Sequence, residues 1–158
     1  MFLQHVVSNG CGGAFFTAKN IVGLEDILNL ARGGLEVKEA ARSCVIFFSR
    51  LCEFVDVTGN DGFYAFMFDT VLVEMWKVML DGGRFNAKDA ACARTASEVA
   101  SLMYIVRGKR PERYEMFLAA LAGWVGGGRR GELLLTLKAA SMEEMKKIVR
   151  EAISCNPP

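Results

Sequence analysis

Hydrophobic residues recur at intervals of three and four positions along most of this chain, which is the spacing of one face of an α-helix. The clearest stripe of this kind spans residues 37–55. Its apolar members are Val37, Ala40, Ala41, Cys44, Val45, Phe48, Leu51, Cys52 and Val55. A shorter amphipathic helix is expected before it, at residues 24–31, and Gly33-Gly34 should end that helix because glycine accepts a left-handed C-cap without strain.

The segment at residues 63–80 is apolar on almost all sides. Its few polar side chains form a narrow strip at helical spacing and are Asp69, Thr70, Glu74 and Lys77. A helix of this composition lies at the centre of a fold or is covered by a partner. We therefore expect that the chain self-associates or needs a partner to hide all of its apolar surface.

Three further helices are expected, at residues 86–107, 112–125 and 142–153. Each begins with a typical start signal: Asn86 as an N-cap with Asp89 in the first turn, Pro111 at a first helical position, and Ser141 with Glu144 as a capping box. The small residues Ala93, Ser97, Ala100 and Ser101 should let another helix approach the first of these closely.

Strand-like patterns occur near both ends of the chain. Residues 2–8 and 14–19 favour a hairpin around the glycine-rich turn between them. Residues 126–131 are a loop by composition. In residues 132–138, Leu133, Leu135 and Leu137 alternate with Leu134, Thr136 and Lys138, a period of two that indicates a strand. The sequence thus predicts one mainly α domain, residues 1–158, with about six helices and a small two- or three-stranded sheet formed near the termini.

The composition agrees with a packed soluble domain. The chain has 158 residues, of which 52% are hydrophobic and 23% charged, so it should bury a core without help from a metal or a disulfide. We expect no signal peptide and no membrane span, and a cytoplasmic location, or a place inside a virion if the source is a virus. A single glutamine, with frequent Arg and Glu, slightly favours a thermophilic source.

Little in the sequence supports catalysis. The one histidine is His5, on a predicted strand, and no residue at a known spacing would orient it toward Cys11 as a nucleophile. The cysteines, which are Cys11, Cys44, Cys52, Cys92 and Cys155, include no CxxC pair, so we interpret them as packing residues and expect no metal. The glycine clusters at residues 10–13 and 123–128 both depart from the nucleotide-binding patterns. We expect no enzyme activity and no cofactor.

The charge distribution is the strongest functional signal. The net charge of +1 excludes a polycation, but the basic residues of the second half gather around one predicted helix. They are Arg107, Lys109, Arg110, Arg113, Arg129 and Arg130. A fourteen-residue helix would hold its two glycine-containing basic ends ~21 Å apart, a span of several phosphates. Arginines on such loops can approach a nucleic-acid backbone, and Tyr104, Tyr114 or Trp124 could stack on bases.

Two hypotheses follow for the function. The leading one is a non-catalytic helical subunit of a multi-protein assembly that contacts a nucleic-acid backbone through those six cations. By analogy of size and composition alone, a small subunit of a prokaryotic RNA-guided defence complex or a viral nucleocapsid protein fits this description. The alternative is a structural or adaptor protein that oligomerises through hydrophobic helices without nucleic acid, its cations meeting solvent or an acidic protein surface.

Overall fold

The computed structural model describes residues 21–86, 88–126 and 128–155, and these residues fold into one compact helical unit. The elements in chain order are α2 (Ile21–Gly33), the 3₁₀-turn η2 (Gly34–Glu36), α3 (Lys38–Phe54), α4 (Asp61–Phe66), the π-helical segment η3 (Met67–Val71), α5 (Leu72–Leu80), α6 (Ala90–Lys109), α7 (Pro111–Trp124), α8 (Gly128–Thr136) and α9 (Met142–Ser154).

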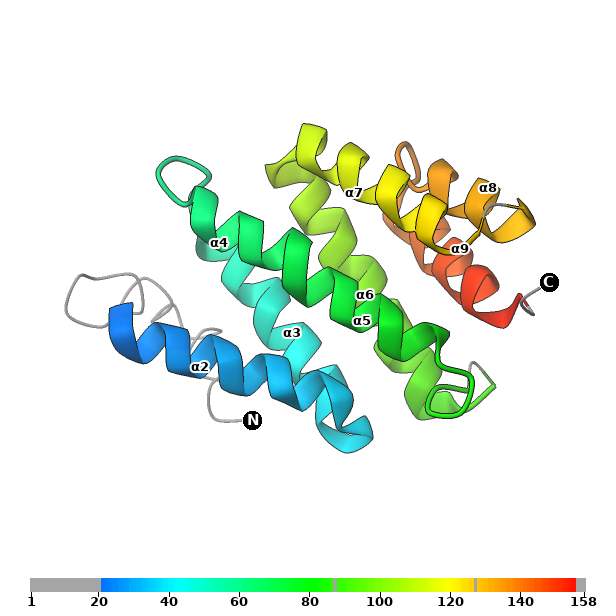
Figure 1. Ribbon diagram of the computed structural model, residues 1–158, viewed down its shortest axis with the longest axis horizontal. Coiled ribbons are helices and arrows are strands. Elements are labelled where there is room, and N and C mark those ends of the chain that lie inside the picture. Colours follow the sequence, from blue (N-terminus) through cyan, green and yellow to red (C-terminus); the bar gives the residue numbers. More distant parts are fainter. Residues whose placement is uncertain (1–20, 87, 127, 156–158) are drawn as a thin grey trace.

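Helix α6 lies at the centre of the fold. It packs against α3 along one side and against α9 along the other, while the continuous run of α4, η3 and α5 crosses over α3 and α6 (Figure 1). Helices α7 and α8 pack against each other beside this run, and α8 also contacts α9. The predicted helices at residues 24–31, 37–55 and 112–125 are confirmed.

The apolar segment at residues 63–80 is helical and central, as one of the two expectations for it required. Its fully or nearly fully buried side chains are Tyr64, Met67, Phe68, Val71, Leu72, Met75, Trp76 and Met79. They pack into the core of their own chain. This segment therefore gives no reason to expect a partner, and any association surface must lie elsewhere.

Two of the three predicted helix starts are where the sequence places them. Pro111 is the first residue of α7, and Ser141 and Glu144 form the capping box of α9. The third is wrong by three residues: Asp89, not Asn86, is the N-cap of α6, and its carboxylate accepts the N–H groups of Ala91 and Cys92 at 2.9 and 3.0 Å. Asn86 instead accepts the N–H of Lys88 in the turn before the helix.

The predicted strand at residues 132–138 is wrong, and so is the part of the predicted loop 126–131 that falls on residues 128–131. Both belong largely to α8. A helix buries Leu134 and Leu137 and leaves Leu135 at the surface, which the alternating pattern did not indicate. Gly131 lies against α7, where an added Cβ would come 3.4 Å from the carbonyl oxygen of Ala122. The proximity of α7 thus explains the burial pattern of α8 better than its own sequence does.

The small sheet is accordingly not supported, since no strand occurs among the described residues. The hairpin predicted at residues 2–8 and 14–19 lies outside the part of the chain that the structure describes. No helix within the described ranges combines the length and hydrophobicity needed to cross a bilayer.

Candidate functional site

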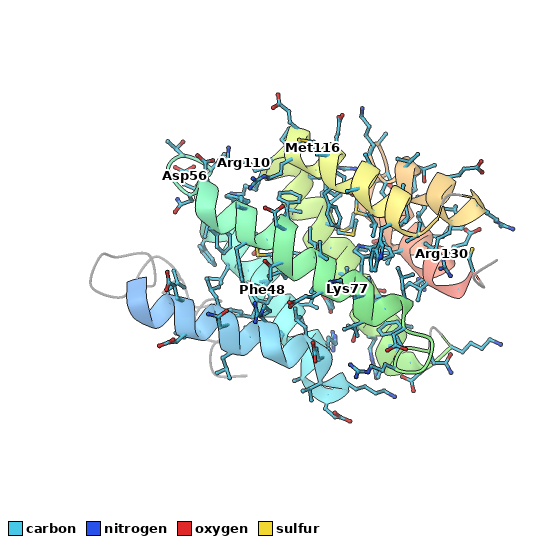
Figure 2. The ribbon with its side chains drawn as sticks, viewed as in Figure 1. Phe48, Asp56, Lys77, Arg110, Met116 and Arg130 are labelled. Atoms are coloured by element: carbon cyan, nitrogen blue, oxygen red, sulfur yellow. The ribbon has the colours of Figure 1, made fainter. Side chains whose placement is uncertain are left out.

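The six basic residues that the sequence singled out fall into two groups at opposite ends of α7. Arg107, Lys109, Arg110 and Arg113 lie near its start, and Arg129 and Arg130 lie just beyond its end in α8. Figure 2 shows the same separation, with Arg110 near the beginnings of α4 and α7 and Arg130 beside α9. Whether a cation is available to a ligand depends on the groups that it already bonds inside the protein.

Arg107 is in the last turn of α6 and is bonded inside the protein. Its Nη1 donates to the carbonyl oxygens of Leu137, Lys138 and Ala140 at 3.1, 3.3 and 2.7 Å. The guanidinium also lies 4.8 Å from the ring centroid of Tyr104. The positive charge thus joins the end of α6 to the turn that leads from α8 into α9, where free carbonyl oxygens carry partial negative charge.

Lys109 and Arg110 do the same for the end of α3. The ammonium of Lys109 donates to the carbonyl oxygens of Glu53 and Val55 at 3.3 and 3.5 Å. Arg110 donates to the carbonyl oxygen of Val57 at 2.7 Å and also bonds the carboxylate of Asp61. Both cations are therefore occupied by groups that would compete with a phosphate.

Arg110 also lies over a buried tyrosine. Its guanidinium carbon is 5.3 Å from the ring centroid of Tyr64, whose hydroxyl donates to the carbonyl oxygen of Val55 at 2.9 Å. Burial raises the pKa of Tyr64 to about 12, and the nearby Arg110 charge opposes that rise. The phenol is neutral at physiological pH, and Arg110 packs against it as a structural cation.

Arg113 is the fourth cation of this end, and no hydrogen bond or ion pair is recorded for it among the described residues. With Lys109 and Arg110 it lines a hollow of about 440 Å³ that also contains Asp61 and Glu112. This hollow is the one place where the structure brings several of the predicted residues together. Its two carboxylates reduce its attraction for a polyanion.

At the other end, Arg129 and Arg130 both contact α9. Arg130 donates from Nε to the carbonyl oxygen of Ala152 at 2.9 Å and from Nη2 to that of Cys155, so it caps the end of α9. Arg129 forms an ion pair with Glu151 at 2.9 Å, and its side chain remains 77% exposed. Of the six cations, Arg113 and Arg129 are thus the ones not bonded to backbone carbonyl groups.

Sequence reasoning missed a second feature, the exposed side of α7. The helix buries Tyr114, Phe117, Leu118 and Leu121. On its other side an uncharged exposed strip runs for about two turns and consists of Met116, Ala119, Ala120, Gly123 and Trp124. Met116 is 73% exposed and Trp124 51% exposed. The available signal was the uncharged stretch at residues 116–128.

Leu135 extends this strip onto α8. It is 52% exposed and lies one helical turn after Gly131, the residue that packs against α7. Farther along, Lys138 forms an ion pair with Glu115 of α7 at 2.9 Å. Leu135 is therefore on the side of α8 next to α7. We call Met116, Ala119, Ala120, Gly123, Trp124 and Leu135 the α7 face.

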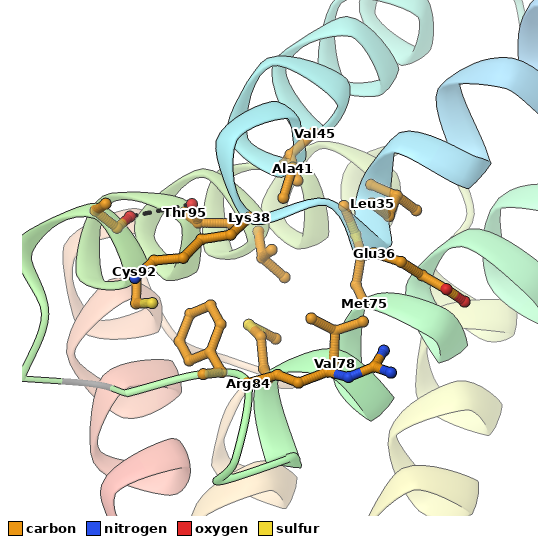
Figure 3. A pocket seen from close by; sticks show the side chains of 14 residues that line it. Leu35, Glu36, Lys38, Ala41, Val45, Met75, Val78, Arg84, Cys92 and Thr95 are labelled. Carbon is orange, nitrogen blue, oxygen red and sulfur yellow. Dashed lines mark hydrogen bonds between the residues drawn. The ribbon is translucent and has the colours of Figure 1, made fainter.

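A third feature is an apolar cavity of about 270 Å³ between η2, α3, α5 and the first half of α6 (Figure 3). Its walls include Val45, Met75, Phe85 and Val99, all buried. Lys38 and Arg84 also line it. The sequence could not indicate this cavity, because its walls come from four separate elements.

Among the described residues, no group of side chains is arranged to hold a metal ion. The described residues contain no cluster of three or more His, Cys, Asp or Glu side chains. His5 and Cys11 lie outside them. Cys44, Cys52, Cys92 and Cys155 are free thiols, and burial raises the pKa of the Cys52 thiol. Glu74, which belongs to the narrow polar strip of residues 63–80, forms an ion pair with Arg32 at 3.8 Å.

Comparisons with known proteins find no relative of this chain. No model of a protein family matches the chain, and neither the curated proteins nor the solved structures searched include one that is similar to it.

Proposed function

We propose that this protein is a non-catalytic assembly subunit that pairs with a second copy of itself through the α7 face. The observation that carries this proposal is the exposed strip of about two turns, without a charged residue, in the second half of α7. Large apolar side chains at 73% and 51% exposure, on one helix side and with small residues between them, are typical of a helix–helix contact.

Gly123 supports the idea of a close contact. It lies within α7, and a Cβ built at this position would meet no atom of the protein within 4 Å. Its φ is not among the positive ones, which among the described residues belong to Gly59, Gly126 and Gly128. The chain's own fold therefore does not require glycine here, although glycine costs a helix ~1 kcal/mol relative to alanine. A second helix that approaches the bare backbone would explain it.

The face is also self-complementary. In an antiparallel pair of α7 helices, a twofold axis between Ala119 and Ala120 places residues at equal distances from it opposite one another. Met116 of one copy then meets Gly123 of the other, a large side chain against an open backbone. The shape of the face therefore favours a second copy as the occupant.

The size of the face sets the strength of the contact. Fourteen residues make a helix ~21 Å long and ~10 Å wide. Even with Leu135 beside it, this surface is smaller than the ~800 Å² per partner of a standard stable interface. We expect a reversible dimer that dissociates on dilution, with each protomer folded on its own.

The experiment is sedimentation analysis over a range of protein concentrations. Ala120→Glu places a charge at the centre of the α7 face and should give a monomer at every concentration. Ala90→Glu is the matched control, because Ala90 is also exposed on a helix but lies on α6 away from the face. It should dimerise like the unchanged chain. A wild-type monomer at high concentration, or equal dimerisation of both variants, would refute the proposal.

Contact with a nucleic-acid backbone remains a second hypothesis, supported by the position of Arg113 and Arg129. These two can be changed without removing a helix cap. A gel shift with single-stranded and duplex nucleic acid at two salt concentrations tests it. If binding occurs, the double change to glutamine should make the log–log salt slope shallower by about 2. Absence of retardation at low salt would exclude the hypothesis.

A further inference from the structure

We propose that the apolar cavity between η2, α3, α5 and α6 binds an unbranched aliphatic monocarboxylate of about ten carbons. This site is independent of the α7 face. It rests on three properties of the cavity: its volume, the chemistry of its walls and the basic residues at its edge.

The volume fixes the size of the ligand. The cavity holds about 270 Å³. An apolar cavity of ~150 Å³ in a folded protein accepts benzene, which has six carbons, so in proportion this one accepts roughly ten.

The walls of the cavity favour a ligand with an apolar chain. Leu35, Val45, Met75, Met79, Phe85 and Val99 are all buried and line it. Thr95 is the polar uncharged residue of the wall, and its hydroxyl donates to the carbonyl oxygen of Ala91 at 3.1 Å. This hydrogen bond satisfies the hydroxyl, so the inner wall does not call for a polar ligand atom. The unbranched methionine side chains can adjust to the outline of a flexible chain.

The basic residues at the edge of the cavity favour a ligand with an acidic head group. Lys38 of α3 and Arg84, which follows α5, line the cavity, and their charged ends lie at opposite sides of it in Figure 3. Each has only a distant acidic partner: Lys38 is 3.6 Å from Asp89, and Arg84 is 3.5 Å from Asp81. Such exposed pairs contribute little and can open. Glu36 is the acidic residue of the lining, and its carboxylate points away from the centre of the cavity in Figure 3. A carboxylate bound at the edge would pair with one of these cations, and opening the weak existing ion pair would cost little free energy.

Titration calorimetry of the full chain with decanoate, below its micelle concentration, tests the proposal. We expect saturable binding at one site per chain. Across the series from hexanoate to decanoate, affinity should rise about fourfold per methylene, the value of ~0.8 kcal/mol per buried CH₂ converted to a ratio. It should stop rising beyond about ten carbons. No saturable binding, or a rise that continues unchanged to hexadecanoate, would overturn the assignment.

Two matched pairs of variants locate the site. Ala91 lines the cavity and is exposed, so Ala91→Phe should plug the entrance without disturbing the core and weaken decanoate binding at least tenfold. Ala90→Phe, one residue earlier and not in the lining, should bind normally. If both variants bind alike, the ligand is not in this cavity.

The head group has its own pair. Lys38→Gln combined with Arg84→Gln should weaken decanoate binding about fivefold and leave decanol binding unchanged. Lys88→Gln with Arg94→Gln, two exposed cations outside the lining, should change neither. Equal affinity of the wild-type chain for decanol and decanoate would refute the carboxylate assignment.

Discussion

Replacing Arg107 by methionine should destabilise the fold by about 3.5 kcal/mol, because this side chain joins the end of α6 to the turn between α8 and α9. Its Nη1 donates to the carbonyl oxygens of Leu137 and Ala140 in part-buried positions. Two bonds from a charged donor contribute ~1.5 kcal/mol each. The exposed bond to Lys138 and the stacking over Tyr104, which is itself 38% exposed, add ~0.5 kcal/mol together. Methionine keeps much of the volume and removes all of these contacts.

The measurement is urea unfolding followed by circular dichroism, with Arg94→Met as the control. Arg94 is on the same helix and is exposed, so its replacement should change the free energy of unfolding by less than ~0.5 kcal/mol. A loss below ~1 kcal/mol for Arg107→Met would show that the carbonyl groups are satisfied equally well by water. If stability were unchanged while nucleic-acid affinity fell, Arg107 would be a phosphate contact and not a structural cation.

The same reasoning gives further expectations. Arg130→Gln should cost ~1–2 kcal/mol by urea unfolding, since it uncaps α9, whereas Arg129→Gln should cost less than ~0.5 kcal/mol; equal losses would contradict the distinction. Asp89 accepts the N–H groups of Cys92 and Ala91, which hold the pKa of its carboxyl below its usual 3.8. Its stabilising effect is therefore present above pH 3.8 and lost as the pH falls through the lower folded value, so Asp89→Ala should lower the melting temperature at pH 7 and flatten its acid dependence. A wild-type pH dependence in the variant would exclude this carboxyl as the cause. Cys52→Ala should cost ~2 kcal/mol and the half-buried Cys44→Ala less, because only Cys52 is fully enclosed; a thiol alkylation assay should likewise label Cys44 before Cys52.

The local parts of the fold could be predicted from the sequence. A proline at a first helical position leaves no N–H unpaired there, and a serine three residues before a glutamate accepts the N–H of that glutamate. Both effects are local, so Pro111 and Ser141 mark helix starts whatever packs around them. Residues 132–138 are different, because their alternating pattern puts Leu135 on the same face as Leu137, whereas α8 buries Leu134 and leaves Leu135 exposed. The close approach of Gly131 to Ala122 of α7 favours the helix, and a periodicity pattern does not report this contact between two helices.

The bonds that the cations make inside the protein could not be predicted for a related reason. Arg107 and the carbonyl groups that it bonds are separated by 30 residues or more, and Lys109 reaches back by more than 50. A basic residue beside a glycine appears exposed in the sequence, yet the ends of neighbouring helices present carbonyl groups that attract it. The preference of cations for helix C-termini also acts between one helix and the end of another. Which helix end lies nearby is a tertiary property.

The positions of the α7 face and the cavity make the two proposals independently testable. The cavity is lined by the first half of α6, from Ala91 to Val99, whereas α7 follows its last residue, Lys109. A helix of 20 residues is ~30 Å long, and substitutions more than ~10 Å apart with no shared partner usually have additive effects. Ala120→Glu should therefore abolish dimerisation and leave decanoate affinity unchanged, and Ala91→Phe should do the reverse. If decanoate shifts the monomer–dimer equilibrium, the two sites are coupled through α6, and Ala120→Glu must then change decanoate affinity as well, because linkage is reciprocal.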